Sequence, residues 1–268
     1  MGETTSRRRL GVKGRPLVST LAYILMVAVT PRPAMAASFD HSAYEAVLKQ
    51  HVDEAGLVDY NGLAKDERFH GYISTLKGAD PSQLSRDGQM AFWINAYNAL
   101  TLFHVMDTKP SKSVRETGIP GLWTSTAFFR DKLPVAGKRM SLDEIEKAIL
   151  KPEFQDPRIH FALVCASRGC PPLPRFAYTE ENVQGKLEDE TRKYLNSPRG
   201  TRIDLKENVL YVSKLFDWYR EDFVRKSGSI EDFIRLYLEQ DAATFLDLKP
   251  KLDFLPYDWS LNAQTPLE

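Results

Sequence analysis

The chain has 268 residues, of which 43% are hydrophobic and 27% are charged, and 36 basic residues balance 36 acidic ones. This length, without internal repeats or low-complexity segments, favours one globular domain with a substantial core. The balanced charge excludes the basic footprint of a nucleic-acid-binding protein.

The first 36 residues have the pattern of an export signal peptide. A basic beginning precedes an apolar run over 17–30, which is shorter than the roughly 20 residues of a membrane span, and Ala34, Met35 and Ala36 fit a small-x-small cleavage site. We expect cleavage after Ala36 and a periplasmic or secreted mature domain over 37–268, with the general secretory route favoured over the twin-arginine route. An uncleaved N-terminal anchor is the alternative.

The mature chain is expected to be mildly acidic and free of membrane spans. Cleavage removes six basic residues and one acidic residue, which leaves 30 basic against 35 acidic. We therefore expect no nucleic-acid partner, and no stable membrane span after signal cleavage, because no later apolar run is long enough.

The first half of the mature chain is predicted to be mainly helical. Apolar residues spaced by three and four predict helices over 41–48 and around 69–76, and alternation over 56–60 predicts a short strand. The strongest helix covers about 88–106 and is apolar around most of its circumference. We expect this helix to be central and buried.

Three residues of the central helix are candidate site residues. Asn95 and Asn98 need partners, because a buried amide without a hydrogen bond costs about 1–3 kcal/mol. They either pin the backbone of neighbouring loops, or orient a catalytic ring and stabilise an oxyanion. Trp93 is a candidate substrate-binding residue.

The second half of the chain mixes hairpins with helices. Residues 110–137 predict a long loop with a hairpin of the kind that covers a site, and Ser141 with Glu144 predicts a capping box at the start of a helix. The remaining elements are expected at 179–194 (helix), 203–205 and 209–212 (hairpin), 215–224 and 229–238 (helices) and 255–262 (strand or extended arm). We predict an α+β fold in which a central buried helix packs on a small mixed sheet, with several peripheral helices.

Residues 158–173 contain both cysteines of the chain. The apolar run over 159–164 predicts a strand buried on both faces, with His160 near its start and Cys165 at its end. Gly169 and two prolines then turn the chain. Strand alternation places His160 and Cys165 on opposite faces with Cα atoms about 16 Å apart, so a direct pair requires a sharp bend after residue 164.

Cys165 has several alternative roles. As a nucleophile it would use His160 as base, the N–H groups of the following turn as oxyanion donors and Arg168 to lower its pKa, with Ser167 and Arg168 contacting substrate. As half of a disulfide with Cys170 it would be inert, and an exported protein meets the oxidising conditions for that bond. Buried free thiols or a metal site are further alternatives. The available ligands match no zinc spacing, so we expect no metal and no cofactor.

Two carboxylates, Asp217 and Asp258, lie beside tryptophan and tyrosine residues. Their simplest role is that of a buried, paired carboxylate among aromatic core residues. Either one is also a candidate to orient the His160 ring.

Four stretches together resemble the domain of unknown function 547 family. They are residues 92–100 (FWINAYNAL), 158–173, 216–223 and 257–262 (YDWSLN), and the resemblance extends over about 50–262. It implies that eukaryotic relatives keep a cysteine at the position of Cys165 and often have serine at that of Cys170, which favours Cys165 as a functional thiol. An Asn-bearing helix before a His-bearing strand is also similar to the core of papain-like and transglutaminase-like enzymes, although these place the nucleophilic cysteine at the start of the helix.

These observations lead to two functional predictions. The first is an exported thiol-dependent hydrolase or acyl transferase that acts on an amide, ester or thioester of a small molecule or peptide-like substrate. Cys165, His160, Asn98 and Asn95 would have the catalytic roles. The second is a non-catalytic periplasmic binding or scaffold domain in which Cys165 and Cys170 form a structural disulfide.

Overall fold

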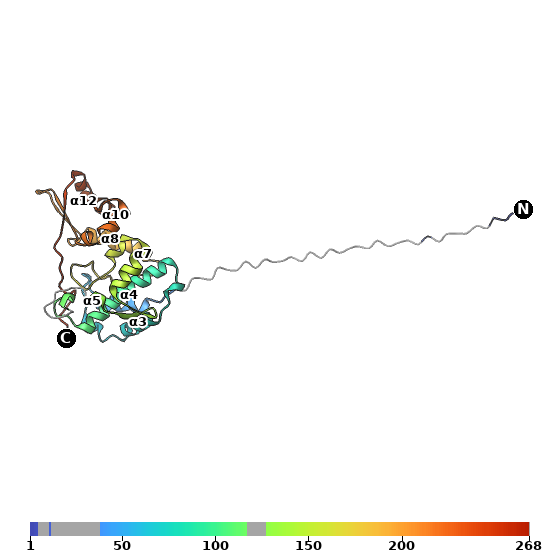
Figure 1. Cartoon of the computed structure of the whole chain (residues 1–268), viewed down its shortest axis with the longest axis horizontal. Helices are drawn as coiled ribbons and strands as arrows, with labels where there is room; N and C mark the ends of the chain where they lie inside the picture. The colour runs from blue at the N-terminus through green and yellow to red at the C-terminus, as the bar shows by residue number, and fades with distance from the viewer. Residues whose placement is uncertain (5–10, 12–37, 117–126, 268) are drawn as a thin grey trace. The chain divides into compact units, whose positions relative to one another are not determined.

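A computed structural model describes residues 1–4, 11, 38–116 and 127–267 of the chain (Figure 1). The chain divides into two compact units, residues 1–35 and 36–268, and every helix and strand below belongs to the second unit. Most of the predicted export signal, and residues 117–126 of the predicted loop, lie outside the described residues.

The described part of the second unit is mainly helical. Its α-helices are α1 (Ser42–His51), α2 (Tyr60–Leu63), α3 (Glu67–Gly78), α4 (Arg86–Thr108), α5 (Ala127–Arg130), α6 (Leu142–Glu144), α7 (Lys151–Phe154), α8 (Val183–Leu195), α9 (Leu215–Trp218), α10 (Arg220–Ser227), α11 (Ile230–Arg235) and α12 (Gln240–Phe245). Four short 3₁₀ helices are η1 (Pro81–Gln83), η2 (Val114–Glu116), η4 (Pro157–Phe161) and η5 (Leu246–Leu248). A π-helix, η3 (Ile145–Leu150), joins α6 to α7.

Two small sheets complete the domain. Strands β1 (Leu133–Val135) and β2 (Lys138–Met140) form an antiparallel hairpin. Strand β4 (Val209–Val212) pairs antiparallel with β3 (Thr201–Asp204) and parallel with β5 (Lys251–Phe254), in the order β3-β4-β5. Helices together with a small mixed sheet confirm the predicted α+β class.

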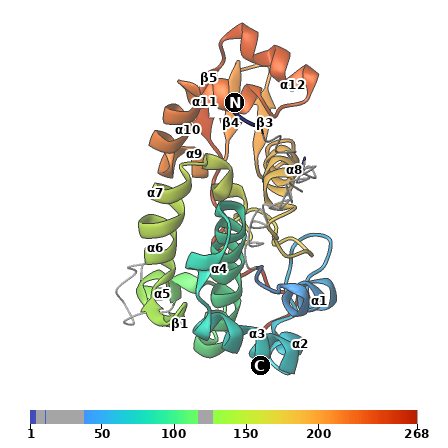
Figure 2. The same cartoon turned by 90° about the vertical axis from the view of Figure 1, so that its right-hand side faces the viewer.

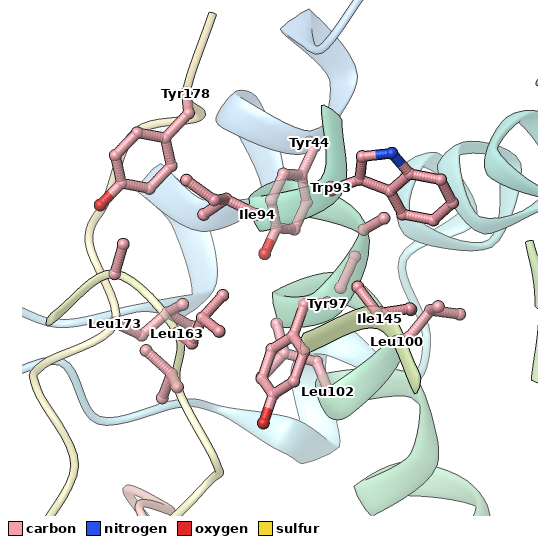
Figure 3. Packing of buried hydrophobic residues seen from close by; sticks show 14 of the residues in the cluster. Tyr44, Trp93, Ile94, Tyr97, Leu100, Leu102, Ile145, Leu163, Leu173 and Tyr178 are labelled. Atoms are coloured by element: carbon pink, nitrogen blue, oxygen red, sulfur yellow. The ribbon is translucent and has the colours of Figure 1, made fainter. Parts of the chain in front are cut away.

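Helix α4 is the predicted central helix. The Ser85 side chain accepts a hydrogen bond from the Gly88 N–H at 3.1 Å at its start, and Lys109 ends it in the left-handed conformation. Most of its residues between these caps are buried, and full burial of a Leu, Ile or Phe side chain contributes about 1.5–3 kcal/mol. Its main contacts are with η3, α3, α8 and η1 rather than with a sheet (Figure 2). Ile145 of η3 lies beside the α4 side chains in Figure 3. The expected packing of this helix on the sheet is therefore replaced by packing on other helices.

The three-stranded sheet belongs to a second apolar cluster. Phe216, Phe223 and Phe233 pack there with centroid separations of 4.5–6.2 Å between their rings. Phe161 of η4 joins the same cluster, while its neighbour Ile159 belongs to the α4 core. Segment η4 therefore connects the two cores, and it carries His160 between them.

The predicted strand over 159–164 is wrong. Pro157 and Asp156 begin a 3₁₀ helix there instead, since the Asp156 side chain accepts the Arg158 N–H at 3.0 Å and the proline supplies a helical φ. An apolar run of this length does not distinguish a buried strand from a buried helical turn. Residues 56–60 likewise form no strand, since Val58 makes isolated bridges to Val52 and Ala263 and Tyr60 begins α2. The helix-then-strand order that suggested a papain-like core is therefore not present.

Candidate functional site

A cavity of about 310 Å³ brings together the histidine, both cysteines and a cluster of aromatic and acidic side chains. Its lining residues come from α4, α5, the α6–α7 segment, η4 and the loop after it, the α9–α10 segment and the C-terminal arm. They are Tyr97, Phe129, Asp143, Glu146, Lys147, His160, Leu163, Cys165, Cys170, Leu215, Trp218, Tyr219, Tyr257 and Trp259. An apolar enclosure with a few converging polar groups is the usual form of a small-molecule site.

The π-helix η3 determines which side chains face His160. The backbone N–H of Lys151 bonds to the carbonyl of Glu146, five residues earlier, instead of the α-helical four. Glu146 approaches the Nδ1 side of the His160 ring and Lys151 approaches its partner Asp222. A π-turn of this kind is rare and frequently occurs at functional sites.

His160 forms a buried pair with Asp222 of α10. Its Nε2 lies 2.9 Å from Asp222 Oδ2, and its ring stacks on Tyr219 with centroids 3.7 Å apart. Asp222 also accepts from Lys151 Nζ at 2.9 Å and Arg225 Nη2 at 3.0 Å. The hydrogen bond from His160 holds the pKa of the Asp222 carboxyl well below its usual range, and burial opposes this only in part. Asp222 therefore stays ionised and fixes the orientation of the ring.

Glu146 is the second buried carboxylate of the site. Its residue is 5% exposed, and Oε1 accepts no hydrogen bond from the described residues. His160 Nδ1 lies 4.0 Å from this oxygen. Burial, and then the Glu146 charge, raise the pKa of the Tyr219 and Tyr97 hydroxyls, so both phenols stay protonated.

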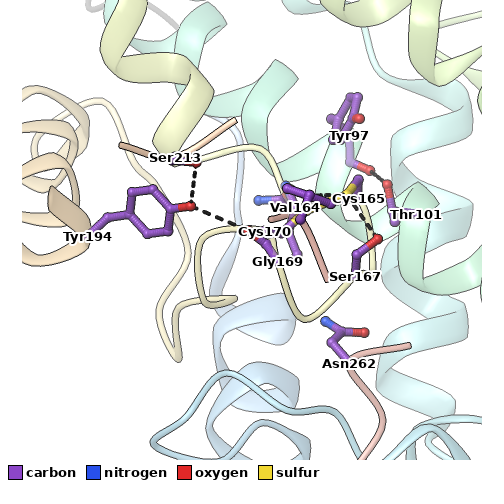
Figure 4. The surroundings of a disulfide bond; sticks show 12 residues. Tyr97, Thr101, Val164, Cys165, Ser167, Gly169, Cys170, Tyr194, Ser213 and Asn262 are labelled. Carbon is purple, nitrogen blue, oxygen red and sulfur yellow. Dashed lines mark hydrogen bonds between the residues drawn. A yellow bond between two sulfur atoms is a disulfide. The ribbon is translucent and has the colours of Figure 1, made fainter. Parts of the chain in front are cut away.

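Cys165 and Cys170 are joined by a disulfide with Cα atoms 6.3 Å apart (Figure 4). The Tyr257 hydroxyl lies 3.2 Å from Cys165 Sγ and 3.0 Å from Cys170 Sγ, and Ser167 Oγ lies 3.4 Å from Cys165 Sγ. Because a disulfide sulfur carries no hydrogen, the hydroxyl groups are the donors in these contacts. In this state Cys165 is not a nucleophile.

Several N–H groups of the turn after Cys165 have acceptors within the protein. The Cys165 N–H contacts Cys170 Sγ at 3.0 Å, and the Arg168 and Gly169 N–H groups donate to the carbonyls of Ser260 and Asp258, both at 2.8 Å. A Cβ on Gly169 would meet the Asp258 backbone at 2.9 Å, which explains the glycine. The Arg168 and Gly169 N–H groups thus hold the C-terminal arm, so these two predicted oxyanion donors are occupied.

Asn95 and Asn98 point to backbone groups. Asn98 donates to the Ala162 carbonyl and accepts the Val164 N–H, both at 2.9 Å. Asn95 donates to the Tyr178 carbonyl at 2.7 Å and accepts its N–H at 3.0 Å. Each amide thus supplies the hydrogen bonds that a neighbouring strand would otherwise give to these backbone groups. This is the first of the two predicted roles, in which the amides pin the backbone of neighbouring loops.

The structure places the three predicted substrate-binding residues outside the cavity lining. Trp93 is buried in the α4 core and its ring packs edge-on against Phe92. Arg168 donates to the carbonyls of Leu261 and Ala263. Ser167 is 2% exposed and contacts the disulfide from behind the cavity wall.

Sequence reasoning missed Asp222, Glu146 and Tyr257 as site residues. Neither expected aspartate orients His160: Asp217 pairs with Lys214 at 2.8 Å, and Asp258 accepts from Ser260. Asp222 lies within residues 216–223, one of the four stretches that resemble the domain of unknown function 547 family. That resemblance was the sequence feature that could have identified it as a site residue. Glu146 had no such signal, because only the π-turn makes it face the cavity.

The part of the chain that the structure describes has neither a metal-ligand cluster nor a membrane-spanning helix. Among residues 38–116 and 127–267, no group of three or more His, Cys, Asp or Glu side chains is arranged to hold a metal ion. Over the same ranges, no helix has both the length and the apolar character needed to cross a membrane.

The fold and site define an α+β domain whose cavity is walled by a disulfide, a His–Asp pair and aromatic rings. Residues 81–195 match the family described as protein of unknown function, DUF547, which confirms the predicted resemblance. The match includes α4, the π-helix and both cysteines, but not Asp222 or the C-terminal arm. No curated protein matches the chain. No solved structure matches it either, so the similarity to papain-like and transglutaminase-like enzymes has no support from that comparison.

Proposed function

We propose that the mature chain is an exported binding domain that holds a small molecule or a peptide-like ligand in the disulfide-walled cavity. The observation that carries this proposal is the convergence of His160, Glu146 and the disulfide on one aromatic cavity. The cavity volume of about 310 Å³ is within the range of small-molecule sites. The disulfide at Cys165 and the occupied N–H groups of Arg168 and Gly169 favour binding over acyl transfer.

Export is part of this proposal. It rests on the signal-like first 36 residues, and a disulfide is the form that two nearby cysteines take in an oxidising compartment. Expression of the full chain in a bacterial host, followed by mass spectrometry of the periplasmic fraction, tests it. The expected product begins at Ala37 and has no thiol that reacts under denaturing conditions. A cytoplasmic, uncleaved product with two thiols would contradict export.

Binding is tested on the purified, oxidised protein. A panel of small aromatic and dipeptide ligands is titrated while tryptophan fluorescence is recorded, because Trp218 and Trp259 both line the cavity. At least one ligand is expected to change the fluorescence saturably. The control Glu45→Gln, in a different cavity, should leave this change intact. A panel without any saturable change would overturn the binding proposal.

A second candidate function is a thiol-dependent hydrolase or acyl transferase that is active only after reduction. Cys165 and His160 line the same cavity, and Asp222 orients the ring, which is the arrangement of a nucleophile, a base and its positioning acid. A phosphine reductant and water would convert the disulfide into two thiols and leave a phosphine oxide. The Cys165 thiol would then attack the substrate carbonyl carbon while His160 accepts the thiol proton. The bond from this carbon to the amine, alcohol or thiol leaving group breaks, and the leaving group takes the proton from His160. Water, or an acceptor alcohol or amine, then cleaves the thioester and restores the Cys165 thiol.

The Cys170→Ser variant separates the two candidates, since it leaves Cys165 free without any reductant. If the thiol enzyme operates, this variant hydrolyses p-nitrophenyl acetate, and Cys165→Ser does not. The same ester turnover by both variants, or by neither, would sink the enzymatic candidate and leave the binding domain.

A further inference from the structure

Among the residues that the structure describes, Glu146 differs from the other carboxylates of the site because no lysine or arginine side chain pairs with it. Asp143 is paired with Lys147 at 2.9 Å, and Asp222 is paired with Lys151 and Arg225. Glu146, at 5% exposure, has one ion-pair contact among the described residues, to His160 Nδ1 at 4.0 Å. Burial of a charged group is costly unless it is paired and hydrogen-bonded. A ligand that supplies the missing positive charge would remove this cost.

The geometry around Glu146 favours an N–H donor. His160 binds Asp222 through Nε2, which leaves Nδ1 facing the Glu146 oxygen across the 4.0 Å gap. A charged N–H group forms hydrogen bonds of about 2.7–2.9 Å to a carboxylate, so one ligand nitrogen can lie within reach of both atoms. A carboxylate or phosphate ligand would instead meet the negative charge of Glu146.

The aromatic wall of the cavity favours the same ligand class. The rings of Trp218, Tyr257 and Trp259 form a contiguous group with centroids 4.6–5.6 Å apart, and Trp218 is 43% exposed. Aromatic faces attract cations within about 6 Å, and here the Arg115 guanidinium already lies 4.9 Å from the Trp259 ring. An exposed tryptophan and a buried carboxylate in the lining of one cavity are the two elements that recognise an organic cation.

We propose that the cavity binds an organic ammonium or guanidinium group, which donates to Glu146 and lies against the rings of Trp218 and Tyr257. This inference rests on the proposed binding function and names its ligand class. The cation belongs to a small molecule or to a side chain or N-terminus of a peptide. Glu146 sets the charge preference, and the aromatic rings contribute affinity that does not depend on one ligand shape.

Three probes of one shape and different charge test the proposal on the oxidised protein: benzylammonium, benzyl alcohol and benzoate. Benzylammonium is expected to bind about tenfold or more tightly than benzyl alcohol, and benzoate most weakly, as charge-assisted hydrogen bonds imply. The variant Glu146→Gln should remove this preference for the cation. The matched control Glu153→Gln changes an exposed glutamate of α7 and should preserve it.

The partly exposed Trp218 supplies a second variant that does not alter a buried position. Trp218→Leu is expected to weaken benzylammonium binding about threefold or more, in keeping with an exposed cation–π contact. Equal affinity for benzylammonium and benzyl alcohol, preferential binding of a neutral monosaccharide, or an unchanged preference in Glu146→Gln would overturn the cation assignment while leaving a binding domain. Failure of every probe and of the wider ligand panel would overturn both proposals.

Discussion

Two cavities of this domain each contain a buried histidine, and their difference shows what makes a site. The larger, about 540 Å³, is lined by His41, Asp40 and Glu45 among others, and the smaller, about 310 Å³, is lined by His160. His41 is 5% exposed and His160 4%. Their burial is therefore nearly equal, and only their partners differ.

His41 has a neutral partner. Its Nδ1 lies 2.7 Å from the Tyr72 hydroxyl, and burial lowers its pKa to about 4, with only a weak opposing effect of Asp40. His160 instead has the ionised Asp222 at 2.9 Å. The buried histidine of the larger cavity thus has a neutral hydrogen-bond partner, although Asp40 and Glu45 line the same cavity, whereas the histidine of the smaller cavity pairs with a buried carboxylate. The partner of the histidine, rather than the cavity volume, distinguishes the candidate site.

The largest expected effect is a loss of stability when Asn98, whose amide bonds to the backbone just before Cys165, is replaced. Asn98→Ala would leave the Ala162 carbonyl and the Val164 N–H unpaired, and two such groups at about 1–3 kcal/mol each predict a loss of about 4 kcal/mol in the free energy of unfolding. Urea denaturation measures this loss, with the exposed Gln83→Ala as control. A loss below 1 kcal/mol would mean that Asn98 is not a structural residue.

The pH dependence of stability tests the His41 side of the comparison. Its pKa is about 4 in the folded state and about 6.5 in the unfolded state, so the unfolded state binds the proton more readily. The contribution of the neutral His41 side chain to the free energy of unfolding is fully present above pH 6.5 and is lost as the pH falls toward 4. The loss amounts to about 3 kcal/mol.

The measurement is the free energy of unfolding of the wild type and of His41→Gln across this range. The difference between the two proteins should change with pH between 6.5 and 4, because only the wild type carries the imidazole. A difference that stays constant would show that His41 is accessible to protons in the folded state.

A smaller effect is expected from the disulfide. Cys165 and Cys170 close a short loop with a sequence separation of 5, for which the chain-entropy relation gives about 2 kcal/mol. Chemical denaturation with and without reductant measures it. The double variant Cys165→Ala and Cys170→Ala should show no dependence on the reductant. If the reductant lowers the free energy of unfolding of that variant by a similar amount, the stabilisation does not come from the Cys165–Cys170 bond.

The smallest effect is expected at the rim of the same cavity. Asp143 and Lys147 form an i,i+4 ion pair with partly exposed side chains, and such pairs contribute at most about 0.5 kcal/mol. Thermal or urea unfolding of Asp143→Asn should therefore differ little from wild type. A loss above 2 kcal/mol would mean that this pair belongs to the buried charge network with Asp222.

Much of the fold could be predicted because local patterns determine it. The central helix, the capping box at Ser141 and the hairpin of β3 and β4 follow from apolar spacing, a reciprocal cap and alternation around a turn. The predicted strand over 159–164 was wrong, because a short buried apolar run has no periodicity that separates a strand from a 3₁₀ turn. The side chain of Asn98, which is far away in the sequence, forms hydrogen bonds with the backbone of Ala162 and Val164 in place of a neighbouring strand.

The candidate site was located from the sequence but could not be assembled from it. Cysteines, histidine and turn residues in one stretch identified Cys165 and His160, and both line the cavity. The choice of Asp222 over Asp217 depends on the packing of α10 against η4, and the inward position of Glu146 depends on the π-turn. The sequence by itself determined the helical core and the chemistry carried by residues 158–173. Only the tertiary structure decided which groups meet, because partners distant in the chain are chosen by packing and not by spacing.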